Sequence, residues 1–86
     1  MDPVLDNVIE VIVHVLGIEE RADELDATTV LFGGIPELDS LAVLELVASL
    51  EERFGIVVED DDVTGEVFET IGTLADFVAE RSRASA

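Results

Sequence analysis

The chain has 86 residues, which suffice for one domain with a modest core but not for a catalytic cleft beside a separate substrate domain. Its 21 acidic residues outnumber four basic residues, all of them arginines, and the formal net charge is −17. This balance argues against nucleic-acid binding, which needs clustered Lys and Arg, and against an anionic membrane surface. It favours partners that present basic docking patches.

The remaining composition indicates a folded intracellular domain. Nearly half of the residues, 49%, are hydrophobic, so the chain is not an acidic disordered tail. Cysteine is absent, which removes disulfides and thiolate nucleophiles. Asp2 and Asn7 stand where a signal peptide would be basic, and no apolar run approaches the length of a membrane span. We therefore expect a single domain over residues 1–86, located in the cytoplasm and monomeric.

The first predicted helix covers residues 3–16. Asp2 before Pro3 is typical of a helix start, and Gly17 is typical of a helix end. Apolar residues recur at spacings of three and four, which favours a helix over the alternative of a buried β-branched strand. The predicted stripe consists of Leu5, Val8, Ile9, Ile12, Val15 and Leu16, widened by Val4, Val11 and Val13. His14 lies off this stripe and is better explained as a partly exposed helix residue than as a general base.

A long connection, residues 18–39, follows this helix. Connections of this length are uncommon in small domains and are usually ordered for a reason. Residues 19–25 are predicted to form a short helical turn, and Gly33 and Gly34 allow a bend before Pro36. The apolar residues that can anchor the connection to the core are Leu25, Leu31, Phe32, Ile35 and Leu38. A crossover of this kind is typical of a bundle whose first two helices are not joined by a tight turn.

The helix predicted over residues 40–54 organises the rest of the chain. Asp39 is a good N-cap because its carboxylate can accept first-turn N–H groups, and Gly55 can take the positive φ that ends a helix. Ser40 is then the first helical residue, with its hydroxyl near solvent. The predicted buried stripe is Val43, Leu46, Val47, Leu50 and Phe54, while Glu45, Glu51 and Glu52 are predicted to face water.

The last third of the chain is predicted to contain a short helix and a third long helix. Residues 56–58 are expected to be extended, and a short helix over residues 63–69 is expected to follow a cap at Asp60 or Asp61. Its inward residues would be Val63, Val67 and Phe68. The last helix is predicted to use Thr73 and Asp76 as a capping box and to bury Leu74, Phe77 and Val78. The fold class is therefore all-α, with three main helices, one short helix and a long first loop.

The run D-S-L-A-V-L-E-L-V-A-S-L-E-E-R-F-G, residues 39–55, resembles the prosthetic-group helix of acyl carrier proteins, the phosphopantetheine-binding carrier family. The resemblance implies a four-helix acyl-carrier-like bundle. It also implies that a phosphopantetheinyl transferase attaches 4′-phosphopantetheine from coenzyme A to Ser40, between Asp39 and Leu41. Acyl groups would then be carried on this arm as thioesters and delivered to partner enzymes, so the chain would not itself be an enzyme.

Two further stretches, L-F-G-G-I-P-E-L-D-S and E-V-F-E-T-I-G-T-L, resemble carrier proteins associated with bacterial exosortase and exopolysaccharide gene clusters. The pathway implied is therefore fatty-acid, polyketide or exopolysaccharide-related biosynthesis. Two alternatives remain open, a peptidyl or amino-acyl carrier domain and a non-carrier acidic helical adaptor. The sequence departs from the usual family pattern at Glu37, Ala42 and Arg53, which bears on the choice of partners.

The resemblance also implies two sets of functional residues. A docking surface for basic patches on partner enzymes would comprise Leu41, Glu45, Ala48, Glu51 and Glu52. The alternative is an ordinary solvated face, which is the usual explanation of a charge run. A pocket for the acyl chain would be lined by Val43, Leu46, Val47, Phe54, Val58, Val63 and Phe68, which are otherwise ordinary core residues.

Two other chemistries are rejected from the sequence. A hydrolase nucleophile at Ser40 would need a base, an orienting acid and an oxyanion hole, and the sequence L-D-S-L-A is not the G-x-S-x-G elbow. An EF-hand starting at Asp60 would need a glutamate at its twelfth position, where Ile71 stands. The acidic cluster of residues 59–62 is therefore expected to bind cations weakly at most, and no metal site is predicted.

Overall fold

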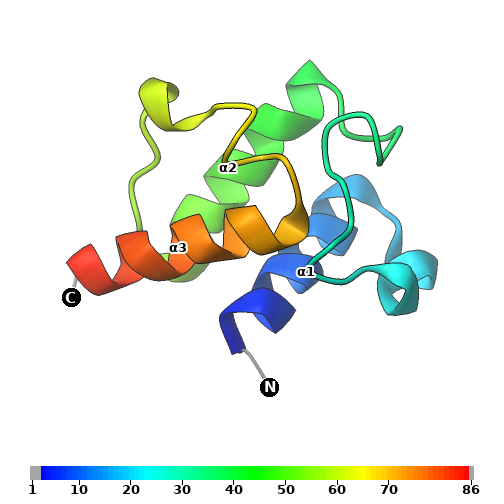
Figure 1. The fold of residues 1–86 in the computed structure, drawn as a ribbon, viewed down its shortest axis with the longest axis horizontal. Helices are drawn as coiled ribbons and strands as arrows, with labels where there is room; N and C mark the ends of the chain where they lie inside the picture. Colours follow the sequence, from blue (N-terminus) through cyan, green and yellow to red (C-terminus); the bar gives the residue numbers. More distant parts are fainter. Residues whose placement is uncertain (1–2, 86) are drawn as a thin grey trace.

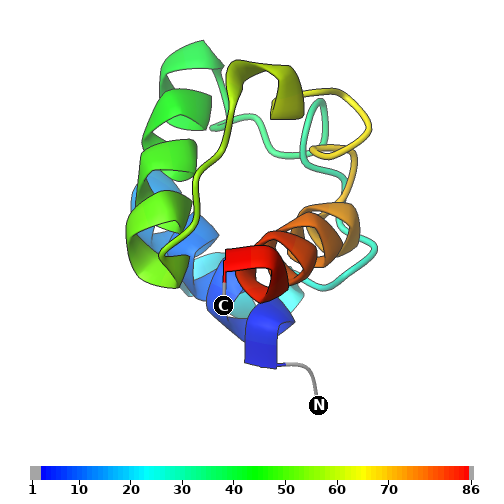
Figure 2. The same ribbon diagram turned by 90° about the vertical axis from the view of Figure 1, so that its left-hand side faces the viewer.

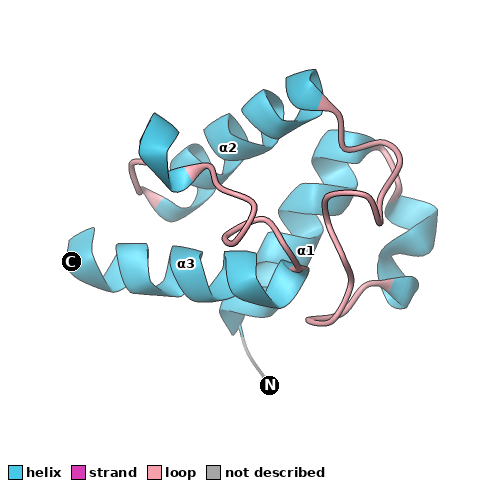
Figure 3. Cartoon of the chain, turned by 45° about the horizontal axis from the view of Figure 1, so that its top comes forward, coloured by secondary structure: helices cyan, strands magenta, loops and turns pink. Residues whose placement is uncertain are grey.

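Three long helices form the body of the molecule. The computed structural model describes residues 3–85, with side chains up to residue 83, and contains α1 (Pro3–Leu16), α2 (Ser40–Phe54) and α3 (Ile71–Ser85). Helix α1 packs extensively against both other helices, whereas α2 and α3 touch each other much less (Figure 1). Two short 3₁₀ helices, η1 (Glu19–Glu24) and η2 (Asp60–Asp62), lie in the connections. The predicted all-α fold with three main helices is confirmed (Figure 3).

Helix α1 has the predicted bounds, and its buried face is made of the predicted apolar residues. Gly17 follows it with φ of 67°, as expected of a C-terminal glycine, while the predicted cap Asp2 lies outside the described residues. The buried residues are Val8, Val11, Ile12 and Val13, and the partly buried ones include Leu5, Ile9, Val15 and Leu16. The face is wide because α1 contacts α2, α3 and η1 together. His14 is exposed, as predicted.

The first connection is ordered by its apolar side chains. Leu31, Ile35 and Leu38 are buried, and Leu25 packs partly against the core. Phe32 is an exception, since 40% of it is exposed. The predicted helical turn near residue 19 is confirmed as η1.

The two connections are joined by main-chain hydrogen bonds that the sequence pattern did not predict. The N–H groups of residues 31, 71 and 72 donate to the carbonyl oxygens of residues 69, 29 and 27, at 2.9, 3.0 and 2.9 Å. Val30 and Thr70 form an antiparallel β-bridge in the middle of this pairing. Figure 2 shows the two connections side by side. We name this pairing of residues 27–31 with residues 69–72 the loop zipper.

The short helix of the second connection lies earlier than predicted. Residues 56–58 are extended as expected, but the helical turn is η2, and residues 65–68 form turns instead of the predicted helix over residues 63–69. Glu59 and Asp62 cap η2 reciprocally, which uses the acidic run itself as the helical turn. Phe68 is buried as predicted, whereas Val63 is 36% exposed, so its predicted inward position is wrong.

Arg81 ties this connection to α3. Its guanidinium donates to the Val57 carbonyl oxygen at 3.1 Å and to Asp62 Oδ1 at 3.0 Å, and lies 4.9 Å from the centre of the Phe77 ring. The Glu59 N–H and then the Arg81 guanidinium hold the pKa of Asp62 below its usual range. The charged form of Asp62 is therefore the form that holds η2 in place.

Helix α3 begins two residues before the predicted N-cap. Thr70 is the capping residue, because its Oγ1 accepts the Thr73 N–H at 3.1 Å. The Thr73 Oγ1 in turn accepts the Thr70 N–H at 3.0 Å, so Thr73 takes the part that the sequence assigned to Asp76. The buried residues include Leu74 and Val78, and Phe77 is partly buried. Among the described residues, no helix combines the length and apolarity that crossing a bilayer requires.

A substitution at Gly34 tests the geometry of the tight turn that precedes α2. A Cβ at Gly34 would lie 2.2 Å from the Val30 carbonyl oxygen and 2.7 Å from the Val30 Cβ. We predict that Gly34→Ala lowers the free energy of unfolding by about 1–3 kcal/mol, because backbone must move to relieve the overlap. Gly65→Ala is the matched control, since nothing lies within 4 Å of its built Cβ, and should change stability by less than about 0.5 kcal/mol. Equal urea midpoints for the two variants would contradict the turn geometry.

Candidate functional site

The N-terminus of α2 is capped as the sequence predicts. Asp39 is extended, with φ of −102°, and its Oδ1 accepts the Ala42 N–H at 2.9 Å. The Asp39 carbonyl oxygen accepts the Val43 N–H at 2.9 Å, which is the first hydrogen bond of the helix. The other first-turn N–H groups of a helix have no intrahelical acceptor, and they give this end a partial positive charge.

Ser40 is exposed at this helix end and faces open space. It lines a surface depression of about 480 Å³ together with Phe32, Leu38, Asp39 and Val43. A phosphodiester on its oxygen would meet both the room and the positive helix end that an anion favours. The residues present therefore fit a phosphate-linked prosthetic group. His14, the only histidine, lies on α1 and lines a different depression, so Ser40 has no histidine beside it.

The outward face of α2 carries four of the five predicted docking residues. Leu41 is 66% exposed, and Glu45, Ala48 and Glu52 are exposed as well. Glu51 is half-buried, and its carboxylate accepts the Val58 N–H at 2.9 Å. The expectation that Glu51 faces water is therefore wrong, because this carboxylate holds the chain that leaves α2.

Leu44 is a candidate docking residue that the sequence reasoning missed. It is 68% exposed, more than any other large hydrophobic side chain among the described residues. Leu44 lies three residues after Leu41 and four before Ala48, so the three share one side of the helix. The same spacing rule, applied to the outward face as well as to the core, could have found it.

The predicted acyl-pocket residues are only partly brought together. Leu46 and Phe68 are fully buried and Val43 is 9% exposed, while Val47, Phe54 and Val58 are partly buried against the core. Val63 lies at the surface. Helices α2 and α3 contact each other little, and buried residues of the two connections, such as Leu31, Ile35 and Phe68, are part of the core.

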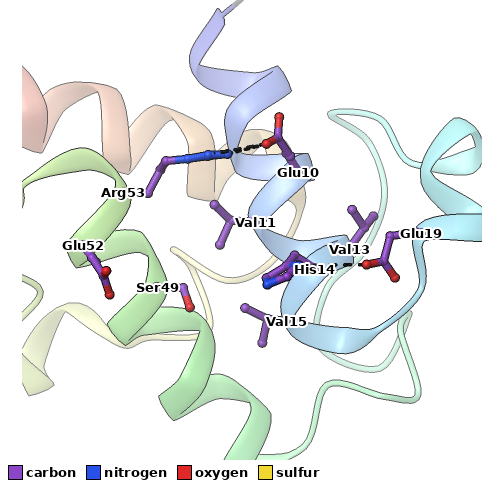
Figure 4. Close-up of a pocket in the computed structure, with 9 residues that line it drawn as sticks. All are labelled: Glu10, Val11, Val13, His14, Val15, Glu19, Ser49, Glu52 and Arg53. Atoms are coloured by element: carbon purple, nitrogen blue, oxygen red, sulfur yellow. Dashed lines mark hydrogen bonds and ion pairs between the residues drawn. The ribbon is translucent and has the colours of Figure 1, made fainter.

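A second depression, of about 720 Å³, lies between α1 and α2. Figure 4 shows Arg53 of α2 paired with Glu10 of α1, and the His14 Nδ1 4.0 Å from a Glu19 carboxylate oxygen. Its lining residues are Glu10, Val11, Val13, His14, Val15, Glu19, Ser49, Glu52 and Arg53, none of which lines the depression at Ser40. This groove is therefore separate from the serine site.

The three departures from the usual family pattern have structural explanations. Arg53 links α2 to α1 through Glu10, and Glu37 pairs with Arg21 of η1. Ala42 is 9% exposed next to the cap, where an acidic side chain would be partly desolvated. These residues serve the packing of this chain, and exposed pairs of this kind contribute about 0–1 kcal/mol each.

Within the part of the chain that the structure describes, no group of three or more His, Asp or Glu side chains is arranged to hold a metal ion. The acidic residues of η2 are instead used in capping and in the contact with Arg81.

Comparison with known proteins finds a family match and a structural match over most of the chain. The sequence matches the family described as a phosphopantetheine attachment site over residues 6–78. The structure is similar to the solution NMR structure of a holo acyl carrier protein from Nitrosomonas europaea, with a TM-score of 0.86 and 41% sequence identity. The match covers 99% of this chain and 100% of that chain.

The contribution of the α2 cap to stability can be measured with two variants that have the same net charge. We predict that Asp39→Ala lowers the free energy of unfolding by about 0.5–2 kcal/mol, because an orphan N–H loses its acceptor. Asp39→Asn removes the same charge but keeps a capping oxygen, so it should retain most of the stability. Urea denaturation of both variants measures the difference. If Asn costs as much as Ala, the carboxylate acts through its charge and not as a cap.

Proposed function

The chain belongs to the phosphopantetheine attachment-site family, and we propose that Ser40 is the residue to which its 4′-phosphopantetheine is attached. The main support is the exposure of Ser40 at the capped, positive end of α2, beside an open depression. The match to a holo acyl carrier protein at 41% identity supports the same use of the fold. The chain is an acyl carrier protein, and such proteins are carriers and not enzymes.

When bound, the arm supplies a thiol on which acyl groups are carried as thioesters. The protein's own residues have simpler tasks in this proposal. Ser40 supplies the oxygen that links the arm, and the positive end of α2 favours the phosphate. Asp39 holds the helix end in place while its exposed carboxylate stays hydrated. Ser40 needs no activating base in its own domain, because a separate phosphopantetheinyl transferase supplies the chemistry of attachment.

We propose that partner enzymes dock on the outward face of α2. Leu41, Leu44 and Ala48 form an apolar line there, next to the carboxylates of Glu45 and Glu52. A partner with an apolar contact inside a basic rim would complement this surface. Exposed charge pairs contribute little affinity but raise association rates at low salt, which suits a carrier that must leave each enzyme quickly.

The finer assignment is also a proposal. We place the chain in the cytoplasm, in fatty-acid, polyketide or exopolysaccharide-related biosynthesis. The high negative charge favours freely diffusing exchange between basic partners over use as a peptidyl carrier within a larger synthetase. An acidic adaptor without a prosthetic group would not require an exposed Ser40 beside a depression.

Attachment to Ser40 is tested by intact-protein mass. Incubation with coenzyme A and a broad-range phosphopantetheinyl transferase should add the mass of one phosphopantetheine to the native protein. The Ser40→Ala variant should gain no mass. The Ser49→Ala variant, which lacks a half-buried serine elsewhere on α2, should be modified like the native chain. A native mass that does not change would favour the adaptor, and modification of Ser40→Ala would place the arm elsewhere.

Docking is tested with the same transferase as the partner. Glu45→Lys and Glu52→Lys should each raise the KM for the carrier several-fold at low ionic strength, because each reverses a charge on the docking face. The effect should shrink as salt is added. Glu66→Lys makes the same charge change on the second connection and is the matched control. Equal KM values for all three variants would show that only net charge matters, and circular dichroism would confirm that each is folded.

A further inference from the structure

Phe32 is placed unusually for an aromatic residue in a core-anchoring loop. Leu31, beside it, is fully buried and anchors the loop, whereas Phe32 is 40% exposed. Single exposed apolar residues are common and need no explanation by themselves. Phe32, however, lines the same depression as Ser40.

The Phe32 ring is held by one aromatic contact, and the backbone around Phe32 is held by hydrogen bonds. It stacks on Phe68, with ring centres 5.6 Å apart and planes inclined by 19°, and Phe68 is only 1% exposed. The loop zipper joins the two segments, since the Leu31 N–H donates to the Glu69 carbonyl oxygen. On the other side, the N–H groups of Gly34 and Ile35 donate to the Leu31 carbonyl oxygen at 3.3 and 3.1 Å. The exposed part of the ring is therefore a fixed apolar surface beside the serine.

We infer that Phe32 is a positioning residue for the phosphopantetheine arm and packs against the arm's dimethyl-substituted carbon. This inference rests on the proposed attachment to Ser40. One methylene beyond the phosphate, the arm carries a carbon with two methyl groups, which is its first apolar part. Leu38 and Val43 also line the depression but are only 8% and 9% exposed. Phe32 thus supplies most of the apolar surface that this carbon could cover.

Contact with Phe32 would determine the direction in which the arm leaves Ser40. Phe32 and Val43 line the depression, whereas Leu41 and Leu44 are exposed and do not line it. An arm that packs on Phe32 leaves Ser40 toward the first connection and keeps clear of the proposed docking face. A partner could then bind α2 without first displacing the arm.

The test uses the holo protein loaded from coenzyme A that carries ¹³C in the two arm methyl groups. On native protein, ring-current effects should move both methyl resonances upfield of those of free pantetheine, and both should show nuclear Overhauser contacts to the Phe32 ring protons. Phe32→Leu should lose the shifts and the contacts while it is still modified, because it keeps apolar bulk without a ring. Phe77→Leu is the matched control and should keep both, since Phe77 packs under Arg81 and does not line the depression.

Intact mass separates the two ways in which this inference can fail. A protein that gains no arm would overturn both the attachment and the positioning. A protein that carries the arm, but whose methyl resonances match free pantetheine and show no contact to Phe32, would overturn the positioning alone. If Phe32→Leu does not fold, the native contacts and the Phe77→Leu control still decide the question.

Discussion

One hydrogen bond, from the Ala42 N–H to Asp39 Oδ1, fixes the residue at which α2 begins. Successive side chains of an α-helix are about 100° apart, so the buried side of α2 determines the direction of every other side chain, while the cap determines where the first turn begins. With the observed start, Ser40 lies at the exposed tip, and Leu41 and Leu44 point to solvent. The same register sends the core residues Val43, Leu46 and Leu50 inward. The cap therefore places the serine at the tip of α2, and the buried side chains direct the docking face outward.

Three of the four arginines in this strongly acidic chain form ion pairs between segments of the fold. Arg21 joins η1 to Glu37 before α2, Arg53 joins α2 to Glu10 of α1, and Arg81 joins α3 to Asp62 of η2. Each pair links segments that are distant along the chain. The outward face of α2 keeps Glu45 and Glu52 for basic partners. The same distribution explains why added salt should weaken partner binding.

Features set by neighbouring residues could be predicted from the sequence, and features set by distant contacts could not. The N-cap at Asp39 and the glycine ends at Gly17 and Gly55, with φ of 67° and 65°, need only local chemistry. The loop zipper leaves no periodic pattern, because its hydrogen bonds join backbone groups of two irregular segments. Either Thr70 or Thr73 could be the N-cap of α3. Hydrogen bonds from the N–H groups of residues 71 and 72 to the first connection favour the earlier start, at Thr70. Glu51 and Phe32 differ from the prediction for the same reason, since the Val58 N–H and the Phe68 ring that contact them come from the second connection.

The central claim is that the hydroxyl at the tip of α2 is the point of covalent attachment. Fragmentation of the modified protein in a tandem mass spectrometer tests it directly, because fragments on either side of a bond show where the added mass lies. The account predicts that fragments ending at Asp39 lack the phosphopantetheine mass and that those extended through Ser40 carry it. An added mass located on any other serine or threonine, with Ser40 unmodified, would contradict it.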